Sequence, residues 1–222
     1  GSDTLTVRLL KNIKGYMASE NLNASIESLE FEFMDAIRLL NQKEPRNIAF
    51  IEGHGELPRV YVYDAEEQLS KYYSINRGQI GQQVGILDQF SAIIIAGPTQ
   101  QFSETEKYII DQYIMLGGRV LWLIDGAYYS YSDLVREGGS ASMKNDTNLD
   151  DLLFAYGVRI NPDLIQDKQC VDIMVMTGDD ERSAVSAPCL YMPLLMPSPD
   201  NLISKDISDV KASFASSLDW VN

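Results

Sequence analysis

The sequence is poor in the residue types that build metal and nucleophile sites. Its 222 residues include two cysteines, Cys170 and Cys189, and one histidine, His54. The cysteines form no CxxC pair, and with a single histidine they cannot complete a four-ligand structural zinc site. Neither cysteine follows a strand at a sharp turn, so we expect buried thiols, and nothing requires a disulfide. We therefore expect neither a metal nor a cofactor.

Basic charge and long apolar runs are also scarce. Lysine and arginine together number 18 against 32 acidic residues, which gives a net charge of −14. A chain of this charge repels the phosphate backbone, so we expect no nucleic acid among its partners. No stretch approaches the roughly 20 apolar residues that span a bilayer. Gly1-Ser2 resembles the remnant of a cleaved tag, which predicts that any membrane segments lie outside this sequence.

Three glycine-dependent motifs are missing. No GxGxxG follows the first predicted strand, and no GxxxxGK[ST] occurs anywhere, so dinucleotide and P-loop nucleotide binding have no support. No GxSxG nucleophile elbow is present either, which excludes an α/β-hydrolase.

The pattern that is present is that of an α/β protein with a mostly parallel central sheet. Apolar runs at 47–52, 91–97 and 119–125 predict strands, and the capping box Ser103-Glu104-Thr105-Glu106 begins a helix over 103–116. Strand, helix and strand at this spacing form a right-handed parallel crossover, so residues 45–160 are predicted to be a Rossmann-like core. Residues 1–44 are predicted to be a lead-in strand and helix, and residues 161–222 a C-terminal extension packed on the core. The other expected elements are strands at 4–14, 72–75 and 171–176, helices at 25–41, 64–72 and 148–156, and loops at 15–24 and 77–89.

Polar residues follow three of these strands, where ligands bind in open parallel sheets. The candidate ligand-binding residues for a small polar molecule are Glu52, His54, Glu56, Thr99 and Asp125. The alternative is a tight turn whose glycines, Gly53 and Gly55, permit positive φ, with His54 serving as a cap. Catalysis by His54 with nearby carboxylates is a further alternative.

Aromatic and proline-rich segments provide candidate partner contacts. Tyr128, Tyr129 and Tyr131 follow the strand at 119–125, where they can face a groove, since aromatic side chains are frequent at interfaces. Four prolines between 188 and 199 mark a second candidate contact segment.

Several segments resemble a known family. These are NIAFIEGHGEL at 47–57, SAIIIAGPTQQFSETEKYIIDQYIMLGGRVLWLID at 91–125 and NLDDLLFAYGVRINPDLIQDKQC at 148–170, with further similarity at 25–41 and in APCLYMPLLMPSP. Together they resemble the GldG-like gliding-motility auxiliary subunits of bacterial ABC transporters.

The resemblance implies a protein held at the inner membrane, with its soluble region in the periplasm and an ABC permease and ATPase as partners. It also implies a class I glutamine amidotransferase-like fold, shared with a domain of an intraflagellar-transport subunit. That fold places its nucleophilic cysteine after a central strand, but the corresponding turn here is Asp125-Gly126. We therefore expect a non-enzymatic accessory or ligand-binding component, with an amidotransferase-like hydrolase and a pure scaffold as alternatives.

Overall fold

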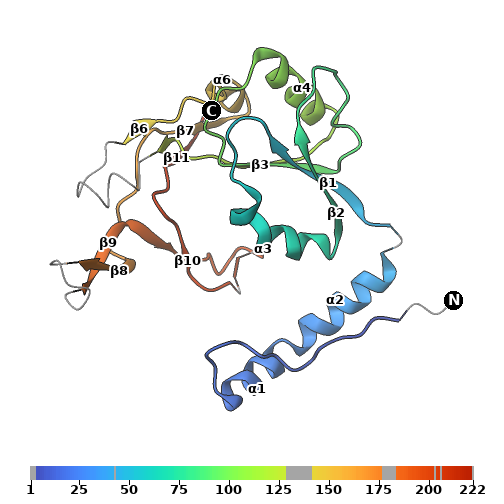
Figure 1. Ribbon diagram of the computed structural model, residues 1–222, viewed down its shortest axis with the longest axis vertical. Helices are drawn as coiled ribbons and strands as arrows, with labels where there is room; N and C mark the ends of the chain where they lie inside the picture. Colours follow the sequence, from blue (N-terminus) through green and yellow to red (C-terminus); the bar gives the residue numbers. More distant parts are fainter. Residues whose placement is uncertain are drawn as a thin grey trace. The chain divides into compact units, whose positions relative to one another are not determined.

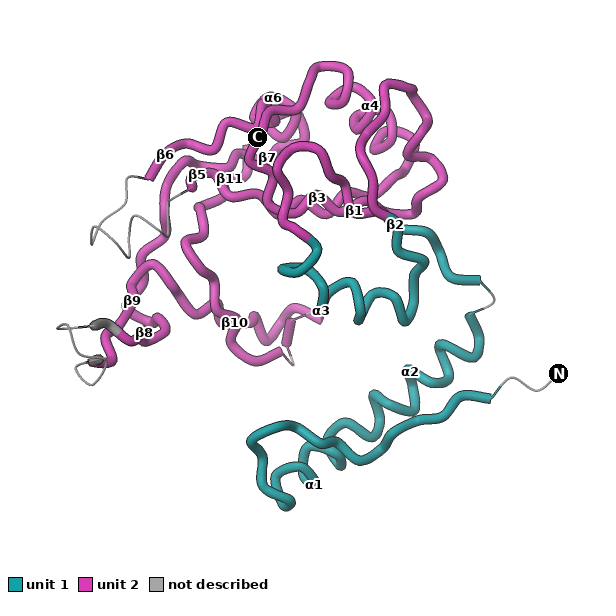
Figure 2. The backbone as a smooth tube through the Cα atoms, in the orientation of Figure 1, with its two compact units in different colours: residues 1–48, 59–76 teal, residues 49–58, 77–222 magenta. Residues whose placement is uncertain are grey.

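The computed structural model describes residues 4–42, 44–128, 142–176, 184–202, 204–205 and 207–221. These residues form two compact units, residues 1–48 with 59–76 and residues 49–58 with 77–222 (Figure 2). The division into segments 1–44, 45–160 and 161–222 stays a prediction.

The first unit contains three helices and the beginnings of two strands. Its helices are α1 (Ala18–Glu27), α2 (Leu29–Asn41) and α3 (Arg59–Ser70). The prediction of a single helix at 25–41 is therefore wrong. Helix α1 begins inside the segment expected to be a loop at 15–24, and the helical region is interrupted at Ser28. The Ser28 N–H reaches the carbonyls of both Ala24 and Ile26, and this tightened turn separates the two helices.

The strand expected at 4–14 is also absent from the described part of the chain. The backbone N–H groups of Lys11 and Ile13 donate to the side chains of Ser25 and Asn21, at 2.8 and 2.7 Å. Side-chain acceptors on α1 thus take the place of a neighbouring strand. The apolar residues that recur every three or four positions in this helical region are largely solvent-exposed, at Ile26, Phe33, Ile37 and Leu40.

A four-stranded parallel sheet is the centre of the α/β fold, which confirms the coarse prediction (Figure 1). Its order is β2-β1-β3-β4, with bounds β1 (Arg46–Glu52), β2 (Tyr73–Gln79), β3 (Ala92–Ala96) and β4 (Val120–Leu123). The strands expected at 47–52, 91–97 and 119–125 are the adjacent strands β1, β3 and β4, and β4 lies at an edge of the sheet. Strand β2 extends into the segment expected to be a loop at 77–89, and α3 begins earlier than the helix expected at 64–72.

The main core lies between β3 and two helices, α4 (Glu104–Met115) and α6 (Asp150–Ala155). The fully buried side chains include Ile93 and Ile95 of β3, Ile109 and Ile110 of α4, and Leu149 before α6. Burial of these aliphatic side chains stabilises the fold by roughly 2 kcal/mol each. Strand β3 carries no charge because both of its faces are covered.

The remaining strands are antiparallel. Short pairs are formed by β5 (Ala127–Tyr128) with β6 (Met143–Lys144), and by β7 (Val158–Ile160) with β11 (Leu218–Trp220). A three-stranded sheet has the order β10-β9-β8, formed by β8 (Cys170–Met176), β9 (Ala184–Leu195) and β10 (Val210–Lys211). Cys170 and Cys189 are free and half-buried, so the expectation of buried thiols is wrong.

Candidate functional site

The loops after β1 and β3 meet where the strand order reverses, which is the usual ligand crevice of an open parallel sheet. Here the two loops are hydrogen-bonded directly to each other. The backbone N–H groups of Thr99 and Gln100 both donate to the His54 carbonyl at 2.8 Å, and Leu57 donates to the carbonyl of Ala96 at 2.9 Å. The crevice is thus closed by backbone bonds between the loops that border it.

Glycines make this close approach possible. Gly53, Gly55 and Gly97 have φ values of 116°, 73° and 64°, which lie in the left-handed region that favours glycine. A Cβ on Gly55 would lie 2.2 Å from the Thr99 hydroxyl oxygen, and one on Gly97 would lie 3.1 Å from Leu57. The predicted tight turn with positive φ is confirmed.

His54 is a buried side chain with a carboxylate at each ring nitrogen. Nδ1 lies 3.2 Å from Glu56 Oε1 and Nε2 lies 3.1 Å from Glu106 Oε1. The imidazole also stacks on Phe102, with ring centroids 3.7 Å apart and an interplanar angle of 11°. Phe102 is itself almost fully buried. Both ring nitrogens are therefore occupied by protein carboxylates.

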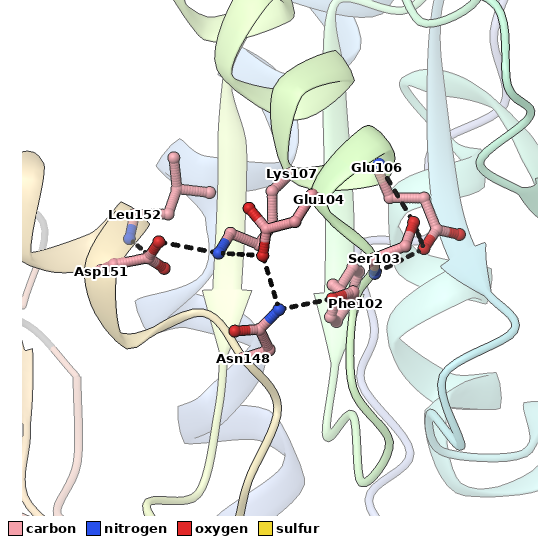
Figure 3. Close-up of polar contacts among 8 residues, drawn as sticks. All are labelled: Phe102, Ser103, Glu104, Glu106, Lys107, Asn148, Asp151 and Leu152. Carbon is pink, nitrogen blue, oxygen red and sulfur yellow. Dashed lines mark hydrogen bonds and ion pairs between the residues drawn. The ribbon is translucent and has the colours of Figure 1, made fainter.

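The second carboxylate comes from the predicted capping box. Glu106 accepts a hydrogen bond from the Ser103 N–H at 2.9 Å, while Ser103 Oγ accepts from the Glu106 N–H at 3.3 Å (Figure 3). Burial acts to raise the pKa of Glu106, but the hydrogen bonds from Ser103 and His54 outweigh it and hold that pKa below its ordinary value. The start of α4 thereby anchors the loop that follows β1.

A neighbouring polar network joins α4 to α6. The nearly buried Lys107 donates to Glu104 at 3.0 Å and to Asp151 at 2.8 Å (Figure 3). Asn148 donates to the Phe102 carbonyl at 2.9 Å and to Glu104 at 3.0 Å. These contacts hold the loop before α6 against the start of α4, so they are structural.

Asp125 and Asn145 lie beside a cavity of about 10 Å³, which is close to the space that one water molecule occupies. The Asn145 amide donates to the carbonyls of Pro98 and Asp125, both at 2.9 Å. Its buried Oδ1 has no hydrogen-bond partner among the described residues. Neighbouring atoms desolvate the Asp125 carboxyl and raise its pKa.

The structure brings only some of the predicted residues together. His54, Glu56 and Thr99 belong to the closed pair of loops, whereas Glu52 forms an ion pair with Arg77 at 2.6 Å. Tyr128 is exposed on β5, and Tyr129 and Tyr131 lie outside the described residues. No group of three or more potential metal-ligating side chains occurs among the described residues.

The sequence did not indicate three residues of the candidate site, Phe102, Glu106 and Asn145. The capping box identifies Glu106 as a helix cap, but no local pattern shows that its other oxygen reaches His54. The stack on Phe102 and the amide bridge of Asn145 likewise join residues far apart along the chain.

A family model described as ABC-type uncharacterized transport system matches residues 45–222. The chain belongs to this family. It is an auxiliary component of an ABC-type transport system. Among solved structures it is similar to the mmIFT52 N-terminal domain, with 19% sequence identity over 79% of this chain and 68% of that chain, and a TM-score of 0.48. No curated protein matches the sequence. In the described part of the chain, no helix has both the length and the apolar character needed to cross a membrane.

Proposed function

We propose that this chain is a non-enzymatic accessory subunit that docks on the permease of an ABC-type transporter and works with its ATPase. Membership of the family supports a role in an ABC-type transport system. The observation that carries the non-enzymatic role is the state of His54, which is buried between two carboxylates and stacked on Phe102. A general base needs a ring nitrogen within reach of substrate, and both are occupied here.

The missing nucleophile supports the same proposal. In the amidotransferase-like fold that we propose for the core, a cysteine would follow β4, and Asp125-Gly126 stands there. Cys170 and Cys189 belong instead to β8 and β9 of the separate antiparallel sheet. The chain would thus retain an enzyme-like scaffold for binding other proteins.

Ligand binding by Glu52, His54, Glu56, Thr99 and Asp125 is the second candidate function. The Asn145 Oδ1 favours it, because this buried acceptor has no partner among the described residues and calls for a donor. The adjoining cavity of about 10 Å³ admits a water and excludes a larger organic molecule. The accessory role therefore has the better support.

For the native protein we propose a GldG-like subunit anchored at the inner membrane, with this region in the periplasm. Tethering raises the effective concentration to about millimolar, so even weak docking is sufficient. To test this, the full-length gene is expressed with its permease and ATPase and with a reporter fused after the residue numbered 222 here. We expect membrane-bound, periplasm-facing reporter and copurification of the permease; a freely soluble cytoplasmic product contradicts the proposal.

A further inference from the structure

Strand β4 is an edge strand of the sheet, and its outer backbone groups are unpaired as far as the described residues extend. The carbonyls of Arg119 and Leu123 accept hydrogen bonds from the N–H groups of Ile93 and Gly97, at 2.8 and 2.7 Å, and so face β3. Backbone groups of successive residues in a strand point to alternate sides, so those of Val120 and Trp122 point away from β3. Within the described residues, no backbone group hydrogen-bonds to them.

Both faces of β4 are apolar and partly exposed. On one face Leu121 and Leu123 are 51% and 50% exposed. On the other face Val120 and Trp122 line a groove of about 370 Å³, which is completed by apolar side chains of α4, α6, β7 and β11. The strand has no charged residue, proline or bulge, the features that normally protect an edge from pairing. An unprotected apolar edge next to an apolar groove is suited to strand addition.

We infer that β4 receives an extended segment of the transporter's permease, which adds to the sheet as a fifth strand. The inference rests on the proposed accessory function, which requires a protein partner. The segment would pair with the outward backbone groups of Val120 and Trp122. Because side chains of a strand alternate between faces, one set of its apolar side chains would enter the groove and the other would cover Leu121 and Leu123.

Charge favours a partner over a second copy of this chain. Two copies, each with a net charge of −14, repel each other. At the groove, the hydroxyl of the lining residue Tyr156 donates to Asp111 at 2.6 Å, and no basic side chain of the described residues pairs with Asp111. Burial, assisted by Asp111, raises the pKa of Tyr156 to about 12, so the hydroxyl remains a donor. The partner segment is therefore apolar on both faces, with a basic residue close to Asp111.

A proline substitution tests strand addition directly. Val120→Pro removes an N–H that β3 does not use, and proline is tolerated at the first residue of an edge strand. Val120→Ala is the matched control, because it also removes the valine side chain but keeps the backbone N–H. We expect Val120→Pro to reduce copurification of the permease about tenfold relative to Val120→Ala. The two variants should have the same melting temperature. Equal copurification by the two variants overturns the inference.

Photo-crosslinking gives a readout independent of the proline. A photoreactive phenylalanine analogue replaces Leu121 or Leu123 in the full-length protein, expressed with its transporter, and Tyr108 on α4, 55% exposed, is the control position. Crosslinks to the permease from the β4 positions but not from Tyr108 support the inference, whereas crosslinks only to other proteins overturn it. Crosslinks only to a second copy, or none from β4, overturn it. If strand addition at β4 is overturned but the wild-type protein still copurifies with the permease, the proposed accessory function still holds.

Discussion

Replacement of His54 by alanine should destabilise the second unit by about 3 kcal/mol. The stack on Phe102 contributes about 1 kcal/mol beyond its buried area. The contacts with Glu56 and Glu106 contribute about 1.5 kcal/mol or more together, because the Glu56 side chain is only 3% exposed and loses a partner that solvent cannot replace. For a domain of this size, the loss corresponds to a decrease in melting temperature of about 6–12 °C.

Urea unfolding of His54→Ala, His54→Phe and the exposed control Tyr108→Ala measures this effect. His54→Phe keeps a stacked ring and loses both carboxylate contacts, so it should fall between wild type and His54→Ala. Hydrogen exchange of the Thr99 and Gln100 amides, which bond to the His54 carbonyl, reports the same region locally. A cost below about 0.5 kcal/mol for His54→Ala, the range of ordinary surface changes, would refute the structural role.

Three further outcomes follow from the same region. Hydrogen bonds from Ser103 and His54 lower the pKa of Glu106 against the opposing effect of burial, so its stabilisation is present above the ordinary carboxyl pKa and lost as pH falls through the lowered value. Glu106→Gln should therefore reduce the loss of stability in acid, measured by urea midpoints from about pH 6 to about pH 3. Lys107→Met should cost less than about 1 kcal/mol and Lys107→Ala about 2 kcal/mol in the same assay, since the buried aliphatic stem matters more than ion pairs with exposed carboxylates. Gly126→Ala should cost about 2 kcal/mol in thermal unfolding, because its Cβ would lie 2.3 Å from the Asn161 carbonyl oxygen; an unchanged melting temperature would contradict this packing.

The sheet could be predicted because its signals are local. The run of isoleucines in β3 and the capping box at Ser103 each lie within a few consecutive residues, and both predictions are confirmed. Strand β9 was not predicted, since Pro188 and Pro193 argue against a strand. Its partner β8 is irregular between Cys170 and Asp172, the residues opposite those two prolines. An irregular ladder of this kind tolerates residues that lack an N–H.

The candidate site was harder to predict because its contacts join distant parts of the chain. The residue types after β1 predicted that Glu52, His54 and Glu56 form one group, but Glu52 forms an ion pair with Arg77 of β2. The second carboxylate at His54 comes from α4. Alternation along a turn does not show which way a side chain points, so the pairing of loops could be found only in the folded protein.

We propose that this chain assists transport by binding and performs no chemistry of its own. The most direct test reconstitutes the permease and ATPase in liposomes with the full-length wild-type protein, the His54→Phe variant or the Val120→Pro variant, at a temperature where all three are folded. ATP turnover coupled to transport is measured. We predict that His54→Phe supports wild-type turnover and that Val120→Pro does not. Loss of turnover with His54→Phe, while that variant is folded and bound to the permease, would contradict the claim.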